Sequence, residues 1–167
     1  MCHASLAAFI DLADFGLISS GATMTPCPWF PAVAAYCREH PAVDMGVHLT
    51  LNSEWTGYRW GPVSTRDRAT GLLDAEGYLW RSSAEVWAHA DAGAGTAELA
   101  AQLDRALAAG IAVTHIDTHM GTIVHPKFIH GYLRLAREHR LPAMVLRWDA
   151  ARWQARGYDV ETAEQAA

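Results

Sequence analysis

The sequence contains no apolar run long enough to cross a membrane and no cluster of basic residues. A membrane-spanning helix needs about 20 mostly apolar residues in a row, and the 167-residue chain has no such run. Its 13 Lys and Arg are outnumbered by 18 Asp and Glu, so the net charge is −5 with His neutral. Nucleic-acid binding depends on basic surfaces that neutralise phosphates. We therefore expect neither a membrane nor a nucleic acid as a partner.

Paired cysteines and a secretion signal are also missing. Cys2, Cys27 and Cys37 form no Cys-x-x-Cys pair, which argues against a disulfide framework and against a structural zinc knuckle. The first residues lack a basic segment followed by an apolar core, so no signal peptide is expected. These features predict a protein of a reducing compartment, the cytoplasm.

The residues that are present predict one globular domain. Hydrophobic residues make up 51% of the chain and charged residues 19%, a balance typical of folded proteins. The length is sufficient for one domain with a core of its own. We predict a single domain over residues 1–167, in which residues 148–167 form a polar, Ala-rich tail without clear order.

Apolar spacing predicts a helix first and then alternating strands and helices. Residues 4–12, 84–90, 96–109 and 126–140 have helical spacing, the third with Thr96 as its N-cap. Strands are predicted at residues 44–51, 113–119 and 142–146. This order implies an α/β architecture with a mainly parallel sheet. Active side chains should then gather at the carboxyl ends of the strands, whether the sheet is open or a barrel.

The most informative stretch is the β-branched run at residues 113–119. Alternate residues of a strand share a face, so His115, Asp117 and His119 are predicted to point the same way. At about 3.3 Å per residue the two histidines would lie about 13 Å apart. That is too far for one metal ion, whose His ligands bind at about 2.0–2.1 Å. Unless the strand ends near Thr118 and the chain turns at Gly121, at most two neighbours of this trio can bind one ion.

A second histidine strand lies at residues 44–51. Its apolar residues at positions 45, 47, 49 and 51 share one face, whereas His48 shares the other face with Gly46 and Thr50. His48 is therefore available for chemistry. A buried histidine that is hydrogen-bonded to backbone would give the same pattern, so this motif alone does not decide the role.

The two histidine strands read Gly46-Val47-His48-Leu49-Thr50-Leu51 and Thr114-His115-Ile116-Asp117-Thr118-His119. In this order they resemble the YdjC-type carbohydrate deacetylases, also called the chitooligosaccharide deacetylase family. Supporting similarity lies in residues 16–24 and in a predicted hairpin at residues 73–78. The resemblance covers about residues 1–147.

The resemblance implies a β/α-barrel-like fold that removes N-acetyl groups from amino sugars with a divalent metal ion, Mg²⁺ or Zn²⁺. It implies that His48 and His119 are metal ligands and that the partner is an N-acetylated sugar or oligosaccharide. Asp117 then orients a ligand imidazole or handles protons, and His115 is a further catalytic candidate. A homodimer is left open as the assembly.

One motif of this family has no counterpart in the chain. The family's Ala-Asp-Asp-x-Gly motif ends the first strand and by resemblance supplies the third metal ligand and the general base. Ala13-Asp14-Phe15-Gly16 contains one Asp and follows the first predicted helix, where the family's pair precedes it. Later strands of the family also lack a counterpart. We therefore predict a partial, incomplete barrel without its first strand, and impaired deacetylase activity.

A long polar and aromatic loop at residues 52–69 holds a second group of candidates. Trp55, Tyr58, Arg59 and Trp60 could stack on sugar rings, or could simply pack against the rim of the barrel. Two other functions stay open. One is a metal-dependent phosphoesterase, for which Arg59 and Lys127 are the local basic candidates. The other is a non-catalytic carbohydrate-binding fragment that uses the aromatic loop alone.

Overall fold

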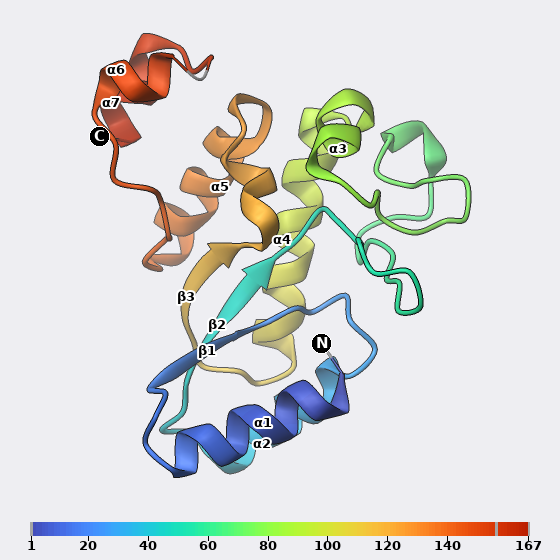
Figure 1. Cartoon of the computed structure of the whole chain (residues 1–167), viewed down its shortest axis with the longest axis vertical. Coiled ribbons are helices and arrows are strands. Elements are labelled where there is room, and N and C mark those ends of the chain that lie inside the picture. Colours follow the sequence, from blue (N-terminus) through green and yellow to red (C-terminus); the bar gives the residue numbers. More distant parts are fainter. Residues whose placement is uncertain (1, 156, 167) are drawn as a thin grey trace.

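The computed structural model describes residues 2–155 and 157–166 as strands and helices that alternate along the chain (Figure 1). The strands are β1 (Ser20–Thr23), β2 (Asp44–Leu49) and β3 (Val113–Thr118). The α-helices are α1 (His3–Asp14), α2 (Phe30–Glu39), α3 (Ser83–His89), α4 (Ala92–Ala108), α5 (Pro126–His139), α6 (Ala150–Gln154) and α7 (Val160–Ala166). Two 3₁₀ segments, η1 (Arg68–Thr70) and η2 (His119–Val124), complete the order.

The three strands form one parallel sheet in the order β1–β2–β3. Because the strands are parallel, their carboxyl ends meet at one edge, and the register sets His48 of β2 beside Asp117 of β3. Each strand is followed by a chain segment that returns over the sheet, as a parallel sheet requires. The predicted α/β architecture with a parallel sheet is confirmed.

The two faces of the sheet differ in chemistry. Val47, Leu49 and Ile116 are fully buried on the face where α4 and α5 pack, and the hydroxyl of Tyr132 on α5 donates to the carbonyl of Ile116 at 3.0 Å. The opposite face carries Gly46 with the polar side chains, and a Cβ on Gly46 would stand only 2.4 Å from Nε2 of His115. Glycine therefore leaves the space that the His115 ring occupies.

The helix α4 starts earlier than its sequence pattern predicts. Asp91 is the N-cap, since its Oδ1 accepts from the backbone N–H of Ala94 at 2.8 Å, whereas the predicted cap, Thr96, lies inside the helix. The buried face includes Glu98 and Gln102, and Leu107 is 41% exposed. Apolar spacing predicts an inner face of Leu99, Leu103 and Leu107; Leu99 and Leu103 are fully buried as predicted, Leu107 is not, and the polar Glu98 and Gln102 complete the face through buried hydrogen bonds.

The C-terminal part is more ordered than predicted. Residues 142–146 do not form a regular strand: Ala143 makes one isolated bridge to Ile116. Within the described residues of the segment 148–167, α6 and α7 correct the prediction of no clear order, and they bury Trp153 and Ala163 against Ile129 of α5; residues 156 and 167 lie outside the described part. Few large apolar side chains hold this segment, so its helical pattern was weak in the sequence.

No helix in the described part of the chain combines the length and the apolar character that a membrane crossing needs. All three cysteines, Cys2, Cys27 and Cys37, are free thiols.

Candidate active site

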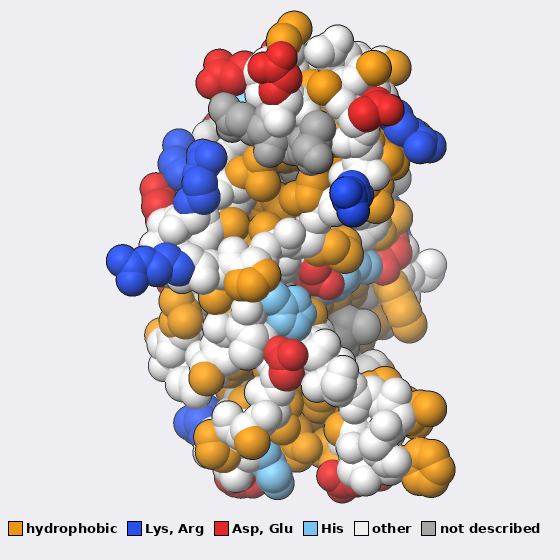
Figure 2. Space-filling view, turned by 90° about the vertical axis from the view of Figure 1, so that its left-hand side faces the viewer, with side chains coloured by type: hydrophobic (Ala, Val, Ile, Leu, Met, Phe, Trp, Pro, Cys, Tyr) orange, Lys and Arg blue, Asp and Glu red, His pale blue; other side chains and the backbone are white. Residues whose placement is uncertain are grey.

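A chain of hydrogen bonds joins four side chains at the carboxyl ends of β2 and β3. Nδ1 of His48 lies 2.7 Å from Oδ1 of Asp117, and Nε2 of His48 lies 3.2 Å from Nδ1 of His119. The other ring nitrogen of His119, Nε2, lies 2.8 Å from Oε2 of Glu54. All four side chains are partly buried. In the space-filling view of Figure 2, histidine and acidic side chains lie directly beside one another in the middle of the face that is shown.

The chain turns sharply directly after His119, at the end of β3. The strand ends at Thr118, and the next segment, η2, contains two residues with left-handed backbone, Met120 at φ 54° and Gly121 at φ 69°. The predicted turn near Gly121 is therefore present, although Met120 shares it. His115 lies farther back along the strand, where its Nδ1 is 2.8 Å from Thr114 Oγ1. The structure thus brings His48, Asp117 and His119 together and leaves His115 apart from them.

The two facing nitrogens are spaced as two ligands of one metal ion would be. Nitrogens at about 2.0–2.1 Å from an ion lie about 2.8–3.4 Å apart at octahedral to tetrahedral angles, and His48 Nε2 and His119 Nδ1 are 3.2 Å apart. Asp117 holds the far nitrogen of His48, an arrangement that orients metal-binding imidazoles in general. Among the described residues, however, no group of three or more His, Cys, Asp or Glu side chains is placed to hold an ion. The spacing of these two nitrogens fits two ligands of one metal ion, and the described residues add no third ligand of these types.

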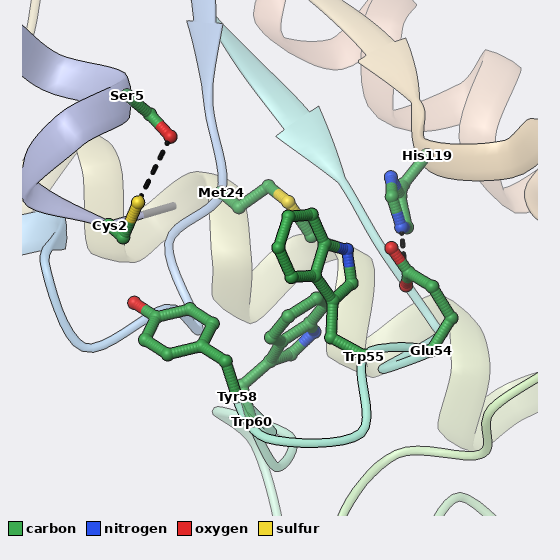
Figure 3. A pocket seen from close by; sticks show the side chains of 8 residues that line it. All are labelled: Cys2, Ser5, Met24, Glu54, Trp55, Tyr58, Trp60 and His119. Carbon is green, nitrogen blue, oxygen red and sulfur yellow. Dashed lines mark hydrogen bonds and ion pairs between the residues drawn. The ribbon is translucent and has the colours of Figure 1, made fainter.

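A pocket of about 340 Å³ opens beside His119 (Figure 3). Its walls are mostly apolar and come from the start of α1, the residue after β1, the loop after β2 and the start of η2, namely Cys2, Ser5, Met24, Glu54, Trp55, Tyr58, Trp60 and His119. Trp55 is 57% exposed, whereas Trp60 is only 4% exposed and meets the His119 ring edge-on at 6.2 Å between centroids. Three of the four predicted aromatic-loop residues therefore line one pocket next to the histidines.

The fourth loop residue, Arg59, has a different environment. Its guanidinium donates to Asp74 Oδ2 and to the carbonyl of Leu79, both at 2.7 Å, and its side chain is 6% exposed. Lys127 donates to the carbonyl of Trp87 at 2.9 Å. Neither basic side chain is among the residues that line the pocket.

Glu54 is the site residue that sequence reasoning missed. It follows β2 in a loop whose aromatic residues were the more visible signal, and a single carboxylate in a loop has no period that reveals its partner. Burial raises the pKa of the Glu54 carboxyl, but hydrogen bonds from His119 and from the backbone outweigh burial, so its pKa lies below the usual range. The carboxylate form is therefore the one that faces His119.

Buried polar side chains hold the loop that carries these residues. The carboxylate of Glu98 accepts from the backbone N–H groups of Val63 and Ser64 at 2.9 and 2.8 Å. Thr122, just after the turn that presents His119, donates its hydroxyl to the side-chain oxygen of Asn52. The loop after β2 and the turn after β3 are thus tied to each other and to α4.

Fold and site define a class: an α/β protein with a histidine–carboxylate cluster at the carboxyl ends of parallel strands, beside an aromatic pocket. A family model described as "YdjC-like protein" matches residues 1–166. The chain therefore belongs to the YdjC-like family.

Comparisons with individual proteins agree with this family. The chain is 34% identical to a carbohydrate deacetylase of Thermus thermophilus over 128 residues, which are 77% of this chain and 44% of that protein. It is 32% identical to a carbohydrate deacetylase of Brevibacillus brevis over 127 residues, 76% of this chain and 48% of that protein. The chain thus spans about half the length of the curated relatives it matches.

A solved structure supports the fold. It is described as a putative cellobiose-phosphate cleavage protein from Enterococcus faecalis V583 and superposes with a TM-score of 0.65 at 28% identity. The match covers 75% of this chain and 47% of that one. A partial barrel-like α/β fold, as predicted, agrees with this coverage.

Proposed function

We propose that this chain carries the two-histidine part of the active site of a metal-dependent carbohydrate deacetylase, which removes N-acetyl groups from amino sugars or their oligosaccharides. The observation that carries the proposal is the 3.2 Å approach of His48 Nε2 to His119 Nδ1 beside an aromatic pocket. Curated relatives at 34% and 32% identity bear the name carbohydrate deacetylase. Both histidines lie in the segments that resemble this family.

His48 and His119 are the proposed ligands of a divalent ion, and Asp117 is the proposed partner that orients His48. Imidazole nitrogens suit Zn²⁺, whereas Mg²⁺ prefers oxygen ligands, so of the two expected ions we propose Zn²⁺. When bound, such an ion supplies Lewis acidity toward the acetyl carbonyl and lowers the pKa of water. Because the described residues offer two ligand nitrogens without a third ligand, we propose that this chain by itself turns over slowly.

The aromatic pocket is the proposed sugar site. Its volume of about 340 Å³ lies within the usual range for small-molecule pockets, about 300–1,000 Å³. Trp55 presents an exposed ring, and Tyr58 and Trp60 add apolar wall, which suits the nonpolar face of a sugar ring or an acetyl methyl group. Arg59 binds the hairpin that pairs Leu73 with Leu79, so we leave it out of the sugar site.

The phosphoesterase alternative has less support. Phosphate recognition uses basic side chains or helix N-termini that point at the ligand, and neither Arg59 nor Lys127 lines the pocket. Binding of a sugar without catalysis remains an outcome that the experiment below can detect. A cytoplasmic location and a homodimer stay predictions; the free thiols agree with a reducing compartment.

The test uses the purified full chain with Zn²⁺ and an N-acetylated chitooligosaccharide. We expect one Zn²⁺ per chain by calorimetry, lost in His48→Ala and in His119→Ala, and weak acetate release that His119→Ala abolishes. Glu138→Gln, an exposed position on α5, serves as the matched control and should change neither.

Three other outcomes would redirect the assignment. Release of phosphate from a sugar phosphate, without acetate release, decides for a phosphoesterase. Sugar binding that survives the double change His48→Ala and His119→Ala with no metal bound decides for a binding fragment. Fast acetate release that depends on His119 would support the deacetylase and contradict the slow turnover.

A further inference from the structure

Both ring nitrogens of each histidine in the cluster have a neighbour. His48 contacts Asp117 through Nδ1 and His119 through Nε2, and His119 contacts Glu54 through its own Nε2. A neutral imidazole carries one N–H donor and one lone pair, whereas an ionised carboxylate only accepts. The two carboxylates therefore decide where the two imidazole protons are.

This assignment creates a conflict between the two rings. Asp117 takes the N–H at Nδ1 of His48, and Glu54 takes the N–H at Nε2 of His119. The nitrogens that face each other at 3.2 Å then both present lone pairs, and two acceptors cannot hydrogen-bond to each other. The two lone pairs repel each other, and positive charge between the two nitrogens, either a proton or a metal cation, stabilises the pair.

We propose that Glu54 is a positioning residue that holds His119 as the Nε2–H tautomer and thereby directs the Nδ1 lone pair of His119, together with the Nε2 lone pair of His48, at a divalent cation. The proposal rests on the metal site of the proposed function and adds a residue and an atom assignment to it. His48 binds through Nε2, His119 binds through Nδ1, and each has its own carboxylate behind it.

The surroundings of Glu54 suit this role. The preceding residue, Ser53, is held at both backbone and side chain: its N–H donates to the carbonyl of Trp80 at 2.7 Å, and its hydroxyl accepts from the backbone of Trp60 at 2.9 Å. The Glu54 carboxylate is 27% exposed and lines a mostly apolar pocket, where a charged hydrogen bond is stronger than in water. A rigid loop therefore presents one carboxylate to one imidazole.

Geometry also argues against Glu54 as a third ligand of the same ion. Its Oε2 contacts Nε2 of His119, on the far side of the ring from the nitrogen that faces His48. Figure 3 shows this carboxylate directly opposite the His119 ring, at the edge of the pocket. The carboxylate thus acts on the ion through the imidazole.

The first test reads the tautomers directly by ¹⁵N NMR of the metal-free chain, at a pH where the ring ¹⁵N shifts show neutral imidazoles. In the wild type we expect His48 as the Nδ1–H form and His119 as the Nε2–H form. In Glu54→Ala the Nδ1–H population of His119 should rise, because that N–H can then donate to His48 Nε2. A wild-type His119 in the Nδ1–H form would overturn the proposal.

The second test measures Zn²⁺ affinity by calorimetry. Glu54→Gln keeps the shape of the side chain but loses its charge, and we expect a loss of about 10–100-fold in affinity, as for other partners behind metal-binding histidines. Asp117→Asn should cause a loss of the same order, and Glu138→Gln should cause none. Far-UV circular dichroism checks that each variant is folded.

The two tests separate the possible failures. Unchanged Zn²⁺ affinity in Glu54→Gln, while His119→Ala abolishes binding, overturns the role of Glu54 and leaves the metal site intact. A wild type that binds no Zn²⁺ overturns the proposed function, and the tautomer of His119 then still decides whether Glu54 orients the ring.

Discussion

Gln102 holds both backbone groups of Thr50, one residue beyond the end of β2. Its side-chain oxygen accepts from the N–H of Thr50 at 3.0 Å, and its amide nitrogen donates to the carbonyl of Thr50 at 2.7 Å. Both residues are fully buried. The Gln102 side chain on α4 thus makes the two backbone hydrogen bonds that a neighbouring strand would make in a wider sheet. These bonds lie two residues beyond His48.

Gln102→Leu should destabilise the protein, because it leaves the buried N–H and carbonyl of Thr50 without partners. Each buried unsatisfied group costs about 1–3 kcal/mol, so we expect the free energy of unfolding in urea to fall by about 2 kcal/mol or more. Gln154→Ala, at an exposed position on α6, should stay within about 0.5 kcal/mol of the wild type. A Gln102→Leu protein as stable as this control would contradict the account.

Asp74 should make the stability depend on pH below about pH 5. Burial raises its pKa, but hydrogen bonds from Arg59 and from the N–H groups of Tyr78 and Glu76 outweigh burial, so its pKa in the folded protein lies below the usual range. The pKa in the unfolded chain is about 3.9. The stabilisation is therefore present above that value and is lost as the pH falls through the folded pKa.

Asp74→Asn tests this dependence by urea unfolding between pH 7 and pH 3. We expect a loss of about 1–3 kcal/mol at neutral pH, the cost of leaving a charged hydrogen bond unmade, and a shallower decline toward low pH than in the wild type. Glu76→Gln is the matched change, because Glu76 also contacts Arg59 but is 63% exposed, and it should cost less than about 1 kcal/mol. Parallel pH profiles for Asp74→Asn and wild type would speak against the Asp74 contribution.

Met120 occupies a left-handed backbone conformation, at φ 54°, directly after His119. A non-glycine residue there costs about 1–2 kcal/mol, and a β-branched residue costs more. We expect Met120→Gly to retain the wild-type stability within about 1 kcal/mol and to retain Zn²⁺ binding. Met120→Val should lower both the melting temperature and the Zn²⁺ affinity, because a β-branched residue strains the turn next to His119. Equal Zn²⁺ affinity of the two variants would show that the turn does not position His119.

Trp55 and Trp60 line the same pocket but differ in burial, 57% against 4% exposed. Trp55→Ala should leave the free energy of unfolding within about 0.5 kcal/mol of wild type and weaken binding of an N-acetylated chitooligosaccharide by about tenfold. Trp60→Ala removes a buried ring and should cost about 3–5 kcal/mol of stability. Fluorescence titration and urea unfolding measure the two effects, and undiminished sugar affinity in Trp55→Ala would remove this residue from the proposed sugar site.

Local patterns in the sequence were sufficient for two of the three strands and for the face on which His48 and Asp117 lie. Period-two alternation predicted β2 and β3, and the same alternation placed His48 and Asp117 on the face that the structure leaves partly open. Sterics of the extended backbone alone set this alternation, so no tertiary contact is needed to predict it. The start of α4 was mispredicted because Asp91, five residues before Thr96, caps the helix, whereas the hydroxyl of Thr96 donates to the carbonyl of Ala92 within it.

The sequence by itself thus determined the class of fold, the family resemblance and the shared strand face of His115 and Asp117. Only the tertiary structure decided that Glu54 lies behind His119, that Arg59 binds the hairpin around Asp74, and that His115 stays apart from the cluster. These relationships join residues 15 to 65 positions apart, or depend on a turn whose direction Met120 and Gly121 set. Periodicity reports which residues share a face, but distances between loops arise from packing. For this reason the contact of the Glu54 carboxylate with His119 could not be found from the sequence.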